Sequence, residues 1–81
     1  MHDDVSSPGR SEELVSLITW HQRRLFAYIM SLVRSPNDAE DILQEVNVVL
    51  WRKRDDFHAG TDFLAWAFRI SRTQVMAFRA R

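Results

Sequence analysis

Hydrophobic residues recur at intervals of three and four over most of the chain, the spacing of amphipathic helices. From Ser11 to about residue 34, this spacing predicts one long helix with Leu14, Ile18, Leu25 and Ile29 on its apolar stripe. Similar patterns predict a second helix over residues 36–54 and a third from residue 63 to the end of the chain. No segment alternates in the manner of a strand. The pattern therefore predicts an all-α protein, a small three-helix bundle.

Short polar segments mark the boundaries of these helices. Ser35 is suited to cap the second helix, and Pro36 suits its first position. The periodicity breaks again over residues 55–62, where Thr61 or Asp62 can cap the last helix. We expect Phe57, the one large apolar residue of this loop, to anchor it to the core.

The 81 residues are enough for one small domain. Residues 1–10 contain a Pro-Gly pair and little that could be buried, so we expect a flexible N-terminal tail followed by a helical domain over residues 11–81. There is no cysteine, and the three histidines lack metal-ligand spacing, so neither a metal nor a cofactor is expected. No catalytic motif stands out, which makes an enzyme unlikely as an expectation. With no hydrophobic leader or membrane-length run, a cytoplasmic location is expected.

Charge is unevenly distributed along the chain. Residues 1–50 carry four arginines against eight acidic residues, and residues 51–81 carry seven basic residues against three acidic ones. The net charges of the two parts are −4 and +4, which cancel in the whole chain. Such asymmetry suggests two partners of opposite electrostatic character, although the two parts could also neutralise each other within the bundle.

The polar face of the second predicted helix is a candidate binding surface. At about 100° per residue, Asp41, Gln44 and Val48 point away from the apolar stripe, while Glu45 and Asn47 lie on its flanks. An acidic helix face is most often simply solvated. Residue types alone leave both interpretations open.

The last predicted helix has the opposite character. Arg69, Arg72 and Arg79 fall on one stripe with Trp66 nearby, and no acidic residue follows Phe63. Arginines at this spacing suit a phosphate backbone, and aromatic rings can stack on unpaired bases. A solvated arginine face above core aromatics is the alternative, and the missing acids favour a polyanionic partner.

The run Asp38-Ala39-Glu40-Asp41-Ile42-Leu43-Gln44-Glu45 resembles the second conserved region of bacterial RNA polymerase sigma factors. The similarity is greatest to the extracytoplasmic-function (ECF) type. It continues through Trp51-Arg52, Phe57 and residues 63–72, so that it covers roughly residues 12–81.

The resemblance implies a transcription initiation factor domain with two partners, RNA polymerase core and promoter DNA. In the family, the second helix binds a coiled coil on the clamp of the largest polymerase subunit. The residues implied in polymerase binding are Asp41, Gln44, Glu45, Asn47 and Val48. The loop and last helix of the family recognise the −10 element and help to melt it through the non-template strand. The residues implied in DNA binding are Phe57, His58, Thr61, Asp62, Trp66, Arg69, Arg72, Thr73 and Arg79.

The chain also departs from the family pattern. Many ECF members have a bulky apolar residue at the position of Asn47, and the loop over residues 57–62 is short and variable in the family. We expect a further domain, which reads the −35 element in full-length members, to be missing from this chain. An anti-sigma factor is an additional partner that the resemblance allows. The alternative function is a sigma-like protein-interaction bundle, an adaptor without DNA contact.

Overall fold

The computed structural model describes residues 3–58 and 60–81, with side chains from residue 11 onward. The predicted all-α fold is confirmed over this part of the chain, where no residue is in a strand. Its elements are α1 (Asp3–Trp20), α2 (Gln22–Val33), α3 (Pro36–Arg52), the 3₁₀ turn η1 (Arg54–Asp56) and α4 (Phe63–Arg79).

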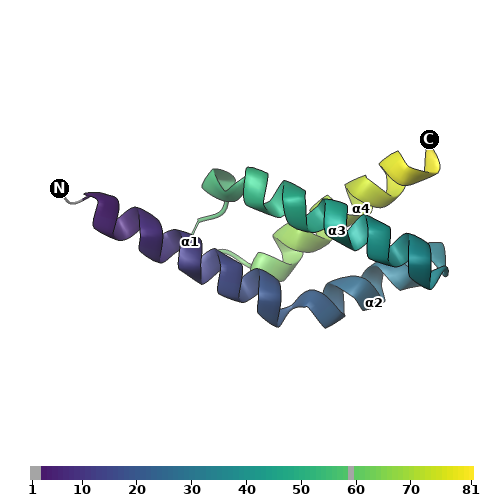
Figure 1. Ribbon diagram of the computed structural model, residues 1–81, viewed down its shortest axis with the longest axis horizontal. Coiled ribbons are helices and arrows are strands. Elements are labelled where there is room, and N and C mark those ends of the chain that lie inside the picture. The colour runs from purple at the N-terminus through teal and green to yellow at the C-terminus, as the bar shows by residue number, and fades with distance from the viewer. Residues whose placement is uncertain (1–2, 59) are drawn as a thin grey trace.

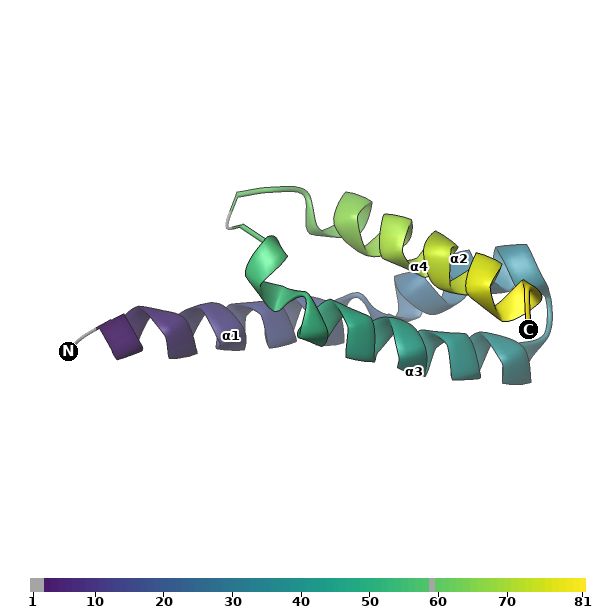
Figure 2. The same ribbon diagram turned by 90° about the horizontal axis from the view of Figure 1, so that it is seen from above.

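Helices α2, α3 and α4 pack against one another in pairs and form the body of the domain (Figure 1). Helix α1 meets α2 at a corner, and its N-terminal part projects beyond the bundle (Figure 2). Within the described residues, no helix combines the length and the hydropathy needed to cross a membrane.

The first predicted helix is two helices, which corrects the three-helix count. Backbone hydrogen bonds from His21 to Leu17 and from Leu25 to His21 persist at the junction, but His21 itself leaves helical geometry. Its ring Nδ1 lies 2.8 Å from the carbonyl oxygen of Leu17, and Gln22 Nε2 donates to Ile18 over 3.0 Å. Side chains that compete for helix carbonyls are a recognised cause of bends, and two do so here.

The first helix also begins earlier than the predicted start at Ser11. Helix α1 begins at Asp3, so residues 3–10 are helical, and residues 1–2 lie outside the described part.

The core lies where the apolar stripes of all four helices meet. Its side chains are at most 9% exposed: Leu14, Leu25, Ile29, Ala39, Ile42, Val46, Leu50, Phe63, Ala67, Ile70 and Val75. Leu43 and Phe78 are only partly buried and pack against its edge. Ser71 is fully buried as well, and it satisfies its hydroxyl by donating to the Ala67 carbonyl over 2.8 Å.

Both predicted caps are confirmed. The Ser35 hydroxyl accepts a hydrogen bond from the Asp38 amide, and the Asp62 carboxylate accepts one from the Ala65 amide. They fix the starts of α3 and α4, the two helices that carry the predicted binding residues.

Helix α3 ends at Arg52, two residues before its predicted end. Trp51, beside this end, is 40% exposed, as an ideal helical wheel places it. The Arg54 guanidinium lies 4.4 Å from the centre of the Trp51 ring. This cation–π contact covers part of the indole from the first residue of η1.

Candidate functional site

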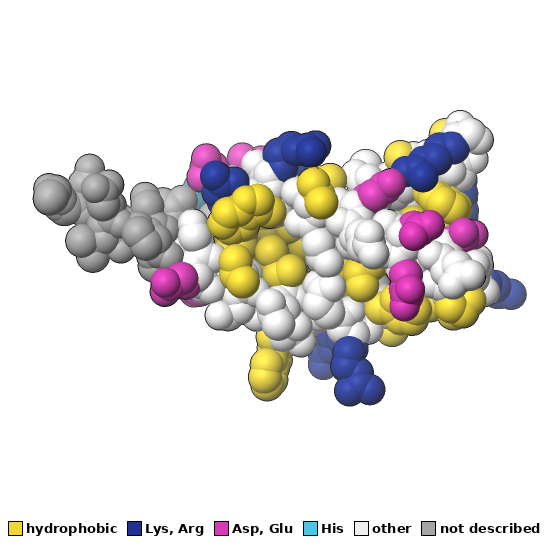
Figure 3. Space-filling view, in the orientation of Figure 1, with side chains coloured by type: hydrophobic (Ala, Val, Ile, Leu, Met, Phe, Trp, Pro, Cys, Tyr) yellow, Lys and Arg dark blue, Asp and Glu magenta, His cyan; other side chains and the backbone are white. Residues whose placement is uncertain are grey.

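The polar face of α3 lies open to solvent. Asp41 and Gln44 are exposed and Val48 is 53% exposed, because Ile42, Val46 and Leu50 hold the opposite face in the core. Figure 3 shows acidic side chains gathered over the N-terminal half of α3. The predicted orientation of this face is therefore present in the folded domain.

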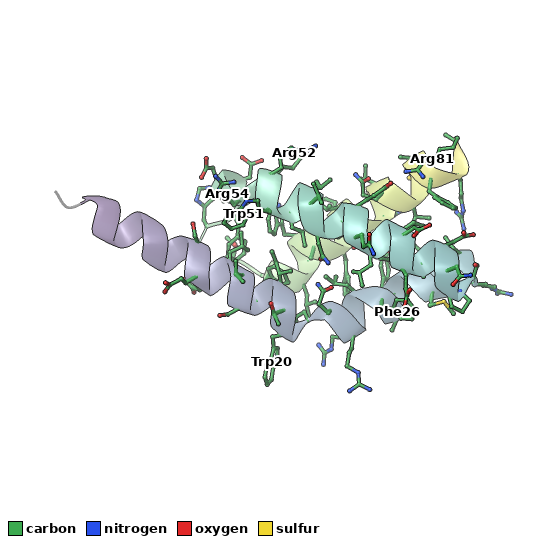
Figure 4. The ribbon with its side chains drawn as sticks, viewed as in Figure 1. Trp20, Phe26, Trp51, Arg52, Arg54 and Arg81 are labelled. Carbon is green, nitrogen blue, oxygen red and sulfur yellow. The ribbon has the colours of Figure 1, made fainter. Side chains whose placement is uncertain are left out.

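A groove runs between this face and the C-terminal end of α4. It is lined by Asp41, Gln44, Glu45, Val48, Val49, Arg52, Gln74 and Arg81. Arg81, labelled in Figure 4, forms an ion pair with Glu45 across the groove. The two side chains are 55% and 39% exposed, and pairs this open to water typically stabilise by no more than about 1 kcal/mol. Glu45 is therefore reachable by a partner but already has a charge neighbour.

Asn47 does not share the open face. Its amide exchanges two hydrogen bonds of 2.8 Å with the amide of Gln22, one in each direction. This reciprocal pair is partly buried and joins α3 to the start of α2, beside the bend at His21. The structure thus uses the Asn47 side chain inside the domain, where the resemblance had implied a polymerase contact.

A second hollow continues from the first along α3 and α4. It is lined by Val49, Lys53, Asp56, Trp66, Arg69, Ile70, Thr73 and Gln74. Val49 and Gln74 belong to both hollows, so the α3 face and the basic part of α4 border one continuous surface. We call this surface the α3–α4 groove.

Lys53 is a residue that our sequence analysis missed. It follows the last residue of α3 and lines the hollow together with Arg69 and Trp66. The signal in the sequence was the basic run Arg52-Lys53-Arg54, which spans the junction of α3 and η1.

An aromatic cluster forms the base of the loop after α3. The Phe57 ring lies 5.8 Å from the Phe63 ring and 5.2 Å from the Trp66 ring, measured between centroids. Phe57 thus anchors the loop as predicted, and its packing uses the ring surface that would otherwise stack on a base. Trp66, like Phe57, stays partly exposed, and it also lines the second hollow.

The loop residues have different tasks in the structure. The Thr61 hydroxyl donates to the His58 carbonyl at 2.5 Å, which closes a tight turn through Gly60 at a φ of 90°. His58, Thr61 and Asp62 are all exposed, and Asp62 also caps α4. A third hollow, lined by Asp56, Phe57, Thr61, Asp62, Ala65, Trp66 and Arg69, lies between this loop and α4.

The three predicted phosphate-binding arginines separate in the structure. Arg69 lines the second and third hollows together with Trp66, and Arg72 is exposed one turn further along. Arg79 instead donates a hydrogen bond to the carbonyl of Leu32, in the last turn of α2. Thr73 lines the groove and donates its hydroxyl to the Arg69 carbonyl over 3.1 Å, which keeps it close to Arg69.

Comparison with known protein families gives a match over residues 17–81, to the model described as Sigma-70 region 2. The match covers most of the chain. The protein belongs to the sigma-70 family, as a region 2 domain. Membership gives this region 2 domain a sigma factor role in binding polymerase core and recognising the promoter −10 element. No solved structure gave a match.

The geometry of this sigma-70 region 2 domain sorts the predicted site residues into two groups. Residues with side chains accessible along the groove or loop are Asp41, Gln44, Glu45, Val48, His58, Thr61, Trp66, Arg69, Arg72 and Thr73. Asn47, Phe57, Asp62 and Arg79 are tied to the fold by the contacts given above, as are Glu45, Thr61 and Thr73 of the first group. Among the described residues, no three His, Asp or Glu side chains come together as a metal site.

Proposed function

We propose that the open face of α3 binds the clamp coiled coil of the largest polymerase subunit, and that the adjoining part of the α3–α4 groove holds the non-template strand. The observation that carries this proposal is the continuity of the two hollows through Val49 and Gln74. One surface would thereby hold the melted strand next to the polymerase contact.

The charges along the groove suit these two partners. Asp41 and Gln44 offer directional acceptors and donors to a basic helical partner. Lys53 and Arg69 offer cations to phosphates, and Trp66 in the same hollow offers a ring to an unpaired base. The exposed loop residues His58 and Thr61 lie at the far end of this path, where an extruded base would enter.

This role needs no chemistry by the chain itself. Unstacking a base costs roughly a few kcal/mol, and the free energy gained when the domain binds the strand offsets this cost. We accordingly propose a non-enzymatic initiation factor domain of the ECF type, acting in the cytoplasm where polymerase core and promoter are found.

Competition for polymerase core tests the α3 contact. Asp41→Lys should weaken binding to core by tenfold or more, because it sets a like charge against a basic partner. Glu40→Lys is the matched control. It makes the same charge change, but on the flank of α3 and not on its open face; Asn47 lies on this flank two turns further along. Equal affinity of the two variants for core would refute the α3 contact.

Binding of single-stranded −10-type DNA to the complex with core tests the strand contact. Lys53→Gln should weaken binding at every sequence and make its salt dependence less steep, because phosphate contacts carry no sequence information. Replacement of His58 should instead change which base is preferred. A domain that binds core but gives no DNA signal, with no salt dependence, would be an adaptor and would contradict this part of the proposal.

A further inference from the structure

The corner between α1 and α2 carries the most exposed large hydrophobic side chain among the described residues. Trp20 is 83% exposed, and Figure 4 shows it pointing away from the helices at this corner. Solvent exposure of an indole to this extent loses the stabilisation that its burial would give. The polymerase and promoter contacts proposed above make no use of Trp20.

Two arginines follow Trp20 at the start of α2. Arg23 and Arg24 follow it by three and four residues and lie in the first turn of α2, just beyond the bend. Both are exposed, because Leu25 and Ile29 occupy the core face of α2. Figure 3 shows basic side chains along the same lower edge as a projecting hydrophobic side chain.

The charge around this corner has a single sign. No Asp or Glu occurs between Glu13 and Asp38, a stretch that includes the end of α1 and all of α2. Within the part of the chain whose side chains are described, neither Arg23 nor Arg24 takes part in an ion pair. The corner therefore presents two uncompensated cations beside an open aromatic ring.

The surroundings of Trp20 distinguish between possible partners. A docking surface for a protein usually has a contiguous apolar centre. The adjacent exposed residue Thr19 is small, and Val15 lies roughly 140° away around α1. An isolated ring among cations fits a strand in which a base stacks on the indole while its flanking phosphates meet the arginines.

We infer that Trp20, Arg23 and Arg24 form a second contact for single-stranded DNA, on a face separate from the α3–α4 groove. The inference rests on the proposed function, which places an opened promoter next to this domain. One base stacks on Trp20, and the two guanidiniums neutralise the adjacent phosphates. The corner would hold a part of the melted strand that has left the groove.

Indole N–H resonances of the 81-residue chain test this directly, because Trp20, Trp51 and Trp66 report different surfaces. Trp20 is assigned with Trp20→Phe, and a 12-nucleotide oligothymidylate is the probe. We expect the Trp20 resonance to shift. Trp20→Ala should weaken binding at the corner by roughly tenfold, read from the Arg24 side-chain resonance. In the double variant Arg23→Gln, Arg24→Gln, the oligonucleotide concentration that gives half of the Trp20 shift should rise. The slope of log affinity against log salt concentration should fall by about 1.4.

A matched control keeps the corner and the groove distinguishable. Arg69→Gln with Arg72→Gln removes the same charge from α4 and should leave the Trp20 curve unchanged. A shift of Trp66 without a shift of Trp20 would overturn the corner and leave the proposed function standing. A shift of Trp20 alone would support the corner and count against the strand contact in the groove, and no shift of either would overturn both.

Two further probes decide the class of ligand. The first is oligouridylate of the same length. If it binds the corner more tightly than oligothymidylate does, the corner is a contact for RNA. Polyglutamate that shifts Trp20 at lower concentration than either oligonucleotide would reassign it to an acidic polypeptide. Because Trp20 is so exposed, its variants should unfold thermally as the unmodified chain does, which far-ultraviolet circular dichroism checks.

Discussion

The Gln22–Asn47 amide pair provides a sharp test of which residues bind polymerase. Each amide donates one 2.8 Å hydrogen bond to the other, in a partly buried position between α2 and α3. A net contribution of about 1 kcal/mol per bond gives a coupling free energy of about 1–2 kcal/mol for the pair. A domain of this size is stabilised by roughly 4–12 kcal/mol in total, so the loss is readily measured.

A double-mutant cycle with Gln22→Ala and Asn47→Ala isolates this coupling. Urea unfolding followed by circular dichroism should show the double variant less destabilised than the sum of the single ones. Gln22→Ala should be the more costly single change, because Gln22 Nε2 also donates to Ile18 at the bend. Gln44→Ala, exposed on the same helix as Asn47, is the control and should change the free energy of unfolding by no more than about 0.5 kcal/mol.

The same variants separate a structural from a binding role. If the Asn47 amide serves the fold, folded Asn47→Ala should bind polymerase core with nearly the affinity of the unmodified domain. Zero coupling in the cycle, together with lost core binding by a fully stable Asn47→Ala, would refute the reasoning. Asn47 would then be a polymerase contact, as the family pattern implied.

Three further predictions follow from burial, capping and charge. Leu50→Ala should lower the free energy of unfolding by about 2–5 kcal/mol, because Leu50 is fully buried; an unchanged urea midpoint would contradict the core assignment. Asp62→Ala should cost about 1 kcal/mol through loss of the α4 cap, and Asp62→Asn should recover most of it in the same assay. Glu45→Gln should change stability by less than about 1 kcal/mol, with a smaller difference at high salt, since its pair with Arg81 is solvent-exposed; a larger effect would indicate a stronger network.

Most of the fold could be predicted from the sequence, because helix caps and apolar faces are determined by residues close together in the chain. The caps at Ser35 and Asp62 and the apolar face of α3 each depend on residues within one or two turns. Hydrophobic periodicity accordingly identified α3, α4 and the loop between them, and the open orientation of Asp41 and Gln44 followed from the same wheel.

Features that depend on distant residues were not predictable in this way. The apolar stripe continues through His21, so nothing in the periodicity indicates a bend; its local causes are two side chains that reach back to helix carbonyls. Gln22 is held by Asn47, 25 positions away in the sequence. Likewise, Glu45 meets Arg81 and Arg79 meets Leu32 only because α4 returns alongside α3 and α2.

Arg69 and Arg79 were both predicted to bind phosphate, and their different surroundings in the structure lead to opposite predictions. Arg69 lines the groove beside Trp66, so Arg69→Ala should reduce the salt slope of −10-strand binding by about 1 and leave stability nearly unchanged. Arg79 donates to the Leu32 carbonyl at the end of α2, so Arg79→Ala should instead lower the free energy of unfolding by about 1 kcal/mol and leave the slope unchanged. Urea unfolding of the domain and a salt titration of its complex with polymerase core and single-stranded DNA measure the two effects. Arg79→Ala could instead reduce the salt slope and leave stability unchanged. In that case the Arg79 guanidinium of the unmodified domain must bind a phosphate rather than the Leu32 carbonyl, and the division of roles along α4 would be wrong.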